Sequence, residues 1–167
     1  MARLFIGIWP DEAVVEALTA IHRKDQRGVR FVPPESWHIT LRFLGEADPD
    51  VAIGALEGTA LPPATARLGP AIDVKAERAL VIPVEGVDEL ATVVRERTRD
   101  IGQPARRRFF GHLTVARLKK HADMPRCLGQ LFSAEMVVDE IAVIESRLHP
   151  DGARYQTLHT LPVEEPA

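Results

Sequence analysis

The sequence predicts an α+β fold built on antiparallel β-sheet. Three observations support this class. Short β-rich segments are mixed with two or three helical segments, both halves of the chain place a helix between two strands, and a tight turn at residues 150–152 joins the last two predicted strands. The 167 residues suffice for one sizeable core, so we expect a single domain over residues 1–167.

Two strands and two helices are predicted in the first half. Residues 3–8 alternate as a strand does and run into a proline, after which Asp11 can cap a helix. That helix carries an apolar stripe, formed by Val14, Val15, Leu18 and Ile21. After two consecutive prolines, residues 37–45 form the second predicted strand. Residues 49–60 then have a helical pattern, which the next pair of prolines ends.

The second half repeats this order and adds a hairpin. Residues 79–84 are a predicted strand, and residues 87–102 are a predicted helix closed by a glycine at its end. Another strand is predicted over residues 111–118. The last two strands, residues 137–148 and 153–161, are joined by a Pro-Asp-Gly turn, which favours antiparallel pairing.

Composition excludes several kinds of protein. Cys127 is the single cysteine, so the chain can form neither an internal disulfide nor a cysteine-based zinc site. The apolar run at residues 4–10 is too short and too close to acidic residues for a signal peptide. No run reaches the roughly 18 apolar residues of a membrane span. We expect a cytoplasmic protein that acts as a monomer, without membrane contact.

Charge restricts where a nucleic acid could bind. The formal net charge of -3 lacks the basic footprint of a protein that binds nucleic acid over its whole surface. Residues 95–120, however, hold nine Arg or Lys against two acids, Glu96 and Asp100. This stretch is either a local contact for RNA or a solvated helix face followed by a loop, and the stretch alone does not decide between them.

A four-residue pattern occurs twice, once in each half. His38-Ile39-Thr40-Leu41 and His112-Leu113-Thr114-Val115 both place His and Thr two positions apart with apolar residues between and after them. A single copy is typical of any half-exposed strand. Chance explains two copies, with apolar residues at all four remaining positions, poorly. The repeated pattern therefore indicates a functional pair.

Strand geometry gives the spacing a chemical meaning. Side chains two positions apart point to the same face, so each His stands beside its Thr on a rigid element, and two copies that face each other form a cleft. Two imidazoles near their ordinary pKa of about 6.5 can supply one base and one acid near neutral pH. Threonine hydroxyls can donate to phosphate oxygens on which charge develops. Phosphodiester cleavage without a metal fits this arrangement.

Other chemistries lack their residues. No serine has the flanking glycines of a nucleophile elbow, and no glycine cluster is suited to a nucleotide-binding loop. No string of the His-Glu-x-x-His kind suggests a metal site, and we expect neither a metal nor a cofactor. The remaining histidines are predicted to be surface or structural residues: His22, His121, His149 and His159.

These motifs resemble those of the RNA 2′,3′-cyclic phosphodiesterases, also described as 2′-5′ RNA ligases, within the two-histidine phosphoesterases. The resemblance covers nearly the whole chain: RLFIGI near the start, ESWHITLRFLGE, GHLTVAR and the closing ESRLHPDGARY. It implies a bilobal fold of two antiparallel sheets with pseudo-twofold symmetry around a central cleft. It also implies hydrolysis of RNA 2′,3′-cyclic phosphate ends to 2′-phosphates. RNA ends of this kind are the expected partner.

The resemblance also implies residue roles. His38 corresponds to the proton donor to the leaving 3′-oxygen, His112 to the base that activates water, and Thr40 and Thr114 to the phosphate-binding threonines. Arg117 matches an arginine that contacts the phosphate. By simple alternation Arg117 lies on the face opposite His112, so this role requires a β-bulge or the end of the strand to redirect it.

Two further positions are less clear from sequence. Gly111 stands where the family often has proline, which we expect to loosen the backbone there without changing the side-chain chemistry. Phe5 is a candidate for stacking on a base, although an aromatic residue in an apolar strand is more often part of the core.

Two alternatives to hydrolysis remain open. The same cleft could belong to a binder of RNA ends or nucleotides without catalysis, although the presence of both His-Thr pairs argues against this. By microscopic reversibility the two histidines could also catalyse 2′-5′ ligation of RNA ends, and the sequence does not rank the two directions.

Overall fold

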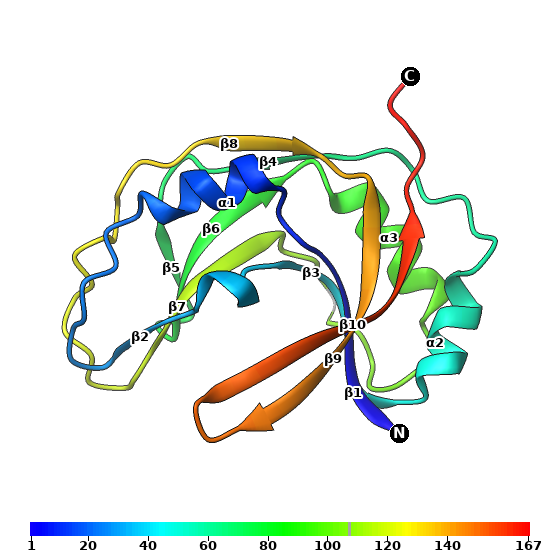
Figure 1. The fold of residues 1–167 in the computed structure, drawn as a ribbon, viewed down its shortest axis with the longest axis horizontal. Helices are drawn as coiled ribbons and strands as arrows, with labels where there is room; N and C mark the ends of the chain where they lie inside the picture. Colours follow the sequence, from blue (N-terminus) through cyan, green and yellow to red (C-terminus); the bar gives the residue numbers. More distant parts are fainter. Residues whose placement is uncertain (107) are drawn as a thin grey trace.

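The computed structural model describes residues 1–106 and 108–167, and it is mostly β-sheet with three α-helices (Figure 1). The helices are α1 (Glu12–Thr19), α2 (Pro49–Leu56) and α3 (Asp88–Arg97), and a 3₁₀ turn covers Pro34–Ser36. The strands are β1 (Ala2–Ile8), β2 (Val29–Phe31), β3 (Ile39–Ala47), β4 (Thr65–Leu68), β5 (Asp73–Lys75), β6 (Ala79–Glu85), β7 (His112–Leu118), β8 (Ala134–Val137), β9 (Glu140–His149) and β10 (Gly152–Pro162).

All strand pairs are antiparallel, which confirms the predicted α+β class. The sheet runs in the order β10-β9-β1-β3-β7-β6-β4-β8, with β2 on β7 and β5 on β6. The pair Ile39 and Leu113 is the single register position that links β3 to β7. The molecule thus has two antiparallel halves that meet at this pair and curl into one continuous sheet (Figure 1).

Every predicted strand and helix is present, with shorter helices. The helix predicted over residues 49–60 ends at Leu56, and the helix predicted over residues 87–102 ends at Arg97, where turns continue to Gly102. Four strands were not predicted, namely β2, β4, β5 and β8. Each has three or four residues, too few to show an alternating pattern.

The helices and the sheet enclose one main core. The side chain of Asp11 accepts a hydrogen bond from the backbone N–H of Val14 at 2.8 Å, which is the predicted cap of α1. Val14 and Leu18 from the predicted stripe are buried, and α1 packs against β8. On the other half α3, which follows β6, packs against β3. Within the described residues no helix is long and apolar enough to cross a membrane.

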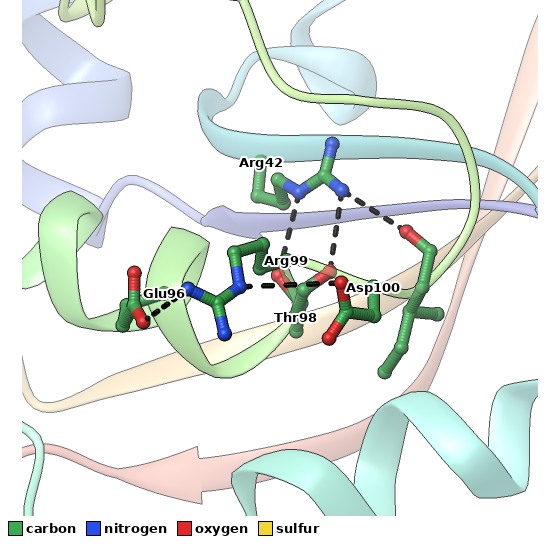
Figure 2. A network of polar contacts seen from close by, with 6 residues as sticks. Arg42, Glu96, Thr98, Arg99 and Asp100 are labelled. Atoms are coloured by element: carbon green, nitrogen blue, oxygen red, sulfur yellow. Dashed lines mark hydrogen bonds and ion pairs between the residues drawn. The ribbon is translucent and has the colours of Figure 1, made fainter.

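A buried arginine ties α3 to β3. Arg42 is 2% exposed, and its Nη2 donates to the carbonyl oxygens of Thr98 and Ile101 at 3.3 and 3.0 Å (Figure 2). Its Nη1 donates to the carbonyl of Phe43 at 2.8 Å. These acceptors include the carbonyls at the end of α3, where a helix leaves oxygens without internal partners and where a positive charge is favourable. Arg42 is therefore a structural clamp between the strand and the helix end.

Candidate active site

The link between the two halves brings the two motifs together. Ile39 and Leu113, the apolar residues inside the two His-x-Thr triplets, are paired and fully buried. Because the pairing is antiparallel, His38 lies on the Thr114 side of this pair and Thr40 lies on the His112 side. The four polar side chains, all partly exposed, thus converge at the centre of the curled sheet.

Both imidazoles are held in the same way. Nδ1 of His38 lies 2.8 Å from the carbonyl oxygen of Ser36, and Nδ1 of His112 lies 2.7 Å from that of Phe110, in each case two residues earlier in the chain. A carbonyl oxygen can only accept, so Nδ1 carries a proton and donates in both rings. Nε2 is then the nitrogen that is left for chemistry in each imidazole.

His38 is enclosed by aromatic rings. Its ring centroid lies 4.7 Å from that of Phe5, 5.2 Å from that of Tyr155 and 6.0 Å from that of Trp9. Its Nε2 lies 3.0 Å from the hydroxyl oxygen of Thr40. The aromatic residues remove water around the imidazole and restrict its orientation, while Nε2 stays directed toward Thr40.

Of the two roles that the sequence left open for Phe5, base stacking or a place in the core, the structure favours the core. It is only 3% exposed, so almost none of its ring is accessible to a nucleotide base. It packs instead with Ala142 and Ile144 and contacts the imidazole of His38. Phe5 is therefore a core residue, as aromatic residues in apolar strands usually are, and its ring supports the imidazole of His38 by direct contact.

His112 has a different environment, made of one ring and several cations. The ring of Phe110 stacks on its imidazole with centroids 5.1 Å apart and an angle of 16° between the planes. Nζ of Lys75 lies 5.2 Å from the centroid of the Phe110 ring. No hydrogen bond between His112 and Thr114 is present in the part of the chain that the structure describes.

The surroundings lower the pKa of both histidines. Burial is the largest cause for His38, and the positive charges of Arg117 and His112 add to it, against the Ser36 carbonyl, which raises the pKa. Burial is also the largest cause for His112. There the Phe110 carbonyl raises the pKa, and the cations Lys75, Arg117 and Arg106 lower it. An anion bound between these cations would offset part of their effect and favour protonation.

Neutralising one of these cations should reverse its part of the shift. We expect Lys75→Met to raise the pKa of His112, because a positive charge near an imidazole disfavours the protonated form. The measurement is an NMR pH titration of the imidazole C–H signals. Lys119→Met, which removes an exposed lysine beyond the end of β7, is the matched control. If Lys75→Met leaves the pKa of His112 unchanged, the charge of Lys75 does not act on His112.

A β-bulge in β7 brings Arg117 to the site. Thr114 pairs with Val81, but Ala116 pairs with Leu80, so one extra residue, Val115, stands in β7 between these positions. The consecutive residues Val115 and Ala116 are both fully buried, which breaks the alternation. Arg117 is therefore redirected and lines the same cavity as His112. Of the two features that could redirect Arg117, a β-bulge or the end of the strand, the structure has the β-bulge.

Gly111 has a steric reason. A Cβ atom at this position would lie 2.4 Å from the carbonyl oxygen of Val84, whose backbone N–H donates to the Gly111 carbonyl at 2.8 Å. The expectation of a loosened backbone is thus replaced by a close approach of two strands that only glycine permits.

Several cations share a cavity with the motifs. It has a volume of about 490 Å³ and is lined by Thr40, His112 and Arg117 together with residues of β5, α3 and the segment 103–110. Lys75, and also Trp9 and Tyr155 beside His38, were not predicted, because no local pattern marks residues that approach the motifs from β5, from the residue after β1 and from β10. Arg106 falls within the basic stretch at residues 95–120, but that stretch did not single it out. Among the described residues no three His, Cys, Asp or Glu side chains lie together as metal ligands would.

Two of the remaining histidines pair with carboxylates outside the motifs. Nε2 of His159 lies 2.8 Å from a carboxylate oxygen of Glu57, and Nδ1 of His149 lies 3.9 Å from one of Asp151. Both imidazoles are partly exposed, in agreement with a surface role.

Residues 9–150 match the family model of the 2′-5′ RNA ligase superfamily. The chain is 34% identical to the RNA 2′,3′-cyclic phosphodiesterase of Thermus thermophilus, over 93% of this chain and 87% of that protein. It is 30% identical to the protein of the same name from Archaeoglobus fulgidus, over 93% and 97%. The crystal structure of the Thermus thermophilus protein TT0787 superposes with a TM-score of 0.78 at 28% identity, over 98% of each chain.

Proposed function

The chain belongs to the 2′-5′ RNA ligase superfamily, and from this membership we propose that it hydrolyses RNA 2′,3′-cyclic phosphate ends to 2′-phosphates. One observation carries the proposal: two imidazoles from the two halves of the sheet each have Nδ1 held by a carbonyl, so that each has Nε2 available at the same site. Two relatives named RNA 2′,3′-cyclic phosphodiesterase support the choice of substrate.

In the proposed reaction, each histidine transfers one proton. Nε2 of neutral His112 takes a proton from a water molecule, whose oxygen forms a bond to phosphorus. The bond between phosphorus and the 3′-oxygen breaks, and Nε2–H of protonated His38 gives its proton to that oxygen. The products are a 3′-hydroxyl and a 2′-phosphate, and the two imidazoles have exchanged protonation states.

The threonines and Arg117 are proposed to hold the phosphate. The hydroxyls of Thr40 and Thr114 can donate to the non-bridging oxygens, which gain charge as the new bond forms. Arg117 lines the cavity with His112, and its positive charge lowers the pKa of both histidines. A bound phosphate would therefore contact Arg117 while it raises the pKa of the imidazole that must donate.

The scheme uses only side-chain groups, so it should operate without a metal. We expect hydrolysis of an oligonucleotide ending in a 2′,3′-cyclic phosphate to continue at an unchanged rate in excess EDTA, with a 2′-phosphate as the product. Mass spectrometry of the products, with and without chelator, is the measurement. Full loss of activity that one divalent ion restores would contradict the mechanism.

The same product analysis tests the alternatives. A binder of RNA ends would leave the cyclic phosphate intact, and ligation would produce a longer strand when a 5′-hydroxyl end is supplied. Hydrolysis is preferred because water is the acceptor present at the highest concentration. The monomeric state and the cytoplasmic location remain predictions from sequence.

A further inference from the structure

The cavity beside His112 is strongly cationic although the chain as a whole is acidic. Six of its lining residues are cations: Arg42, Lys75, Arg95, Arg106, Arg108 and Arg117. None of the described lining residues is Asp or Glu, while the whole chain has a formal net charge of -3. Like charges collected in one cavity repel one another, and a bound polyanion would relieve this repulsion.

These cations fall into three groups. Arg42 is buried and donates to backbone carbonyls, so it belongs to the fold. Arg117, Lys75 and Arg106 lie close enough to His112 to lower its pKa. Arg95 and Arg108 also line the cavity but are not among the cations that lower the pKa of either histidine, and no ion pair engages either of them in the described part of the chain. These last two arginines are available to a ligand that extends beyond the reacting group.

The basic residues of the stretch 95–120 fall into two sets, those that line this cavity and those that do not. Arg97 donates through Nε to the hydroxyl of Thr59 at 2.8 Å, and Arg99 lies 3.2 Å from a carboxylate oxygen of Glu96. Neither residue lines the cavity, whereas Arg95 and Arg108 do. Only part of the local positive charge is thus directed toward the site.

The other side of the site has a different charge. A second cavity, of about 480 Å³, lies on the side of His38 and is lined by Ser36 and Tyr155. Its lining includes two acids, Glu35 and Asp151, and one cation, Arg154. A phosphate backbone would be repelled there and attracted on the His112 side. The charge distribution therefore sets a direction for a bound strand.

We propose that the cavity beside His112 binds the sugar-phosphate backbone of the RNA strand on the 5′ side of the reacting cyclic phosphate. Arg95 and Arg108 contact phosphates at least one nucleotide away from the end, while Arg117 stays with the reacting phosphate. The inference rests on the proposed function, since it takes the cyclic phosphate to lie between His38 and His112. It makes short oligonucleotides, and not mononucleotides, the preferred substrate class.

The test compares two double variants with the same change in charge. R95Q/R108Q removes cations that line the cavity, and R97Q/R99Q removes two from the same stretch outside it. We measure kcat/KM for a hexanucleotide ending in a 2′,3′-cyclic phosphate and for cytidine 2′,3′-cyclic phosphate. R95Q/R108Q should reduce the ratio of the two values by about tenfold or more at low salt, and R97Q/R99Q should leave the ratio as in the wild type.

Salt dependence and binding provide a second readout. Each phosphate contact in single-stranded nucleic acid contributes about 0.7 to the slope of log Kd against log salt concentration, so R95Q/R108Q should lower this slope by roughly 1.4. Fluorescence anisotropy with a hexanucleotide ending in a 3′-phosphate, which is not a substrate, measures Kd. Circular dichroism melting establishes that both variants are folded.

The outcomes separate this inference from the proposed function. If no cyclic phosphate is hydrolysed, but R95Q/R108Q alone weakens hexanucleotide binding, the proposed reaction fails and the backbone site stands. If hydrolysis is normal and R95Q/R108Q leaves both the ratio and the salt slope unchanged, the backbone site is overturned and the reaction stands. An equal loss in both double variants would also overturn the site, because the effect would then follow net charge alone.

Discussion

Replacing either His38 or His112 with alanine should lower kcat/KM for a 2′,3′-cyclic phosphate by about 10² or more, because each imidazole supplies one proton transfer in the rate-limiting step. Glutamine is the matched second substitution, since it retains a polar side chain of similar reach without an imidazole's acid-base chemistry. The measurement is steady-state hydrolysis over a range of pH. A variant at either position that keeps near wild-type rates at every pH would show that this histidine is structural.

The double variant should lose less than the two single losses multiplied together. Groups that act as a unit are strongly non-additive, since the second proton transfer has little left to assist once the first is absent. Thr40→Ala and Thr114→Ala should lower the rate without moving the pH profile, because hydroxyls that hold the phosphate do not titrate. A shift of the profile in Thr40→Ala would indicate that its contact with Nε2 of His38 controls that pKa.

The pH profile also assigns the two roles. Both histidines have a pKa lowered by burial, so the bell-shaped profile of kcat/KM should have its optimum on the acid side of the ordinary imidazole pKa of about 6.5. If His112 is the base, kcat/KM rises with pH as His112 loses its proton. The acidic limb of the profile then reports the pKa of His112. His112→Ala should then flatten the acidic limb and His38→Ala the basic one. The reverse pattern would exchange the roles of donor and acceptor.

The motif-bearing strands could be predicted from sequence because their signal is local. His-x-Thr with apolar neighbours specifies which side chains share a face, and a repeated local pattern suffices to expect two such strands. The environment of each histidine is not local. Phe5, Trp9 and Tyr155 surround His38 from β1, the residue after it and β10, and their meeting depends on strand order and register, which no single segment specifies.

Arg117 shows where a local rule reaches its limit. Alternation alone places it on the wrong face, and only the extra residue Val115 in β7 turns it toward His112. In β3 the register also shifts, since Ile6 pairs with Arg42 and Gly7 with Thr40, which leaves Leu41 as the extra residue. Both motifs thus end at a bulge. In β3 the residue after the bulge is Arg42, which is buried. Phe43 lies three residues after Thr40, at the position that Arg117 occupies after Thr114 in β7.

Arg42 therefore has a structural role, and we expect its replacement to have a large effect on the free energy of unfolding. We expect Arg42→Met to lower the free energy of unfolding by about 2–4 kcal/mol. The change keeps much of the buried volume but leaves the carbonyls of Thr98 and Ile101 without a donor, and an unsatisfied buried acceptor costs about 1–3 kcal/mol. The variant no longer has to bury a charged guanidinium, and this gain offsets part of the loss. The net loss of stability should therefore be smaller than the summed cost of the unsatisfied carbonyls.

The matched control lies in the same network. Arg99, next to the end of α3, pairs with Glu96 and approaches Asp100 at 4.0 Å, but its side chain is 68% exposed (Figure 2). Arg99→Met should change stability by less than about 1 kcal/mol, because exposed ion pairs contribute little. Urea unfolding followed by circular dichroism measures both variants. Equal stability of the two would mean that the carbonyls find other donors when Arg42 is lost, and that α3 does not depend on this clamp to stay against β3.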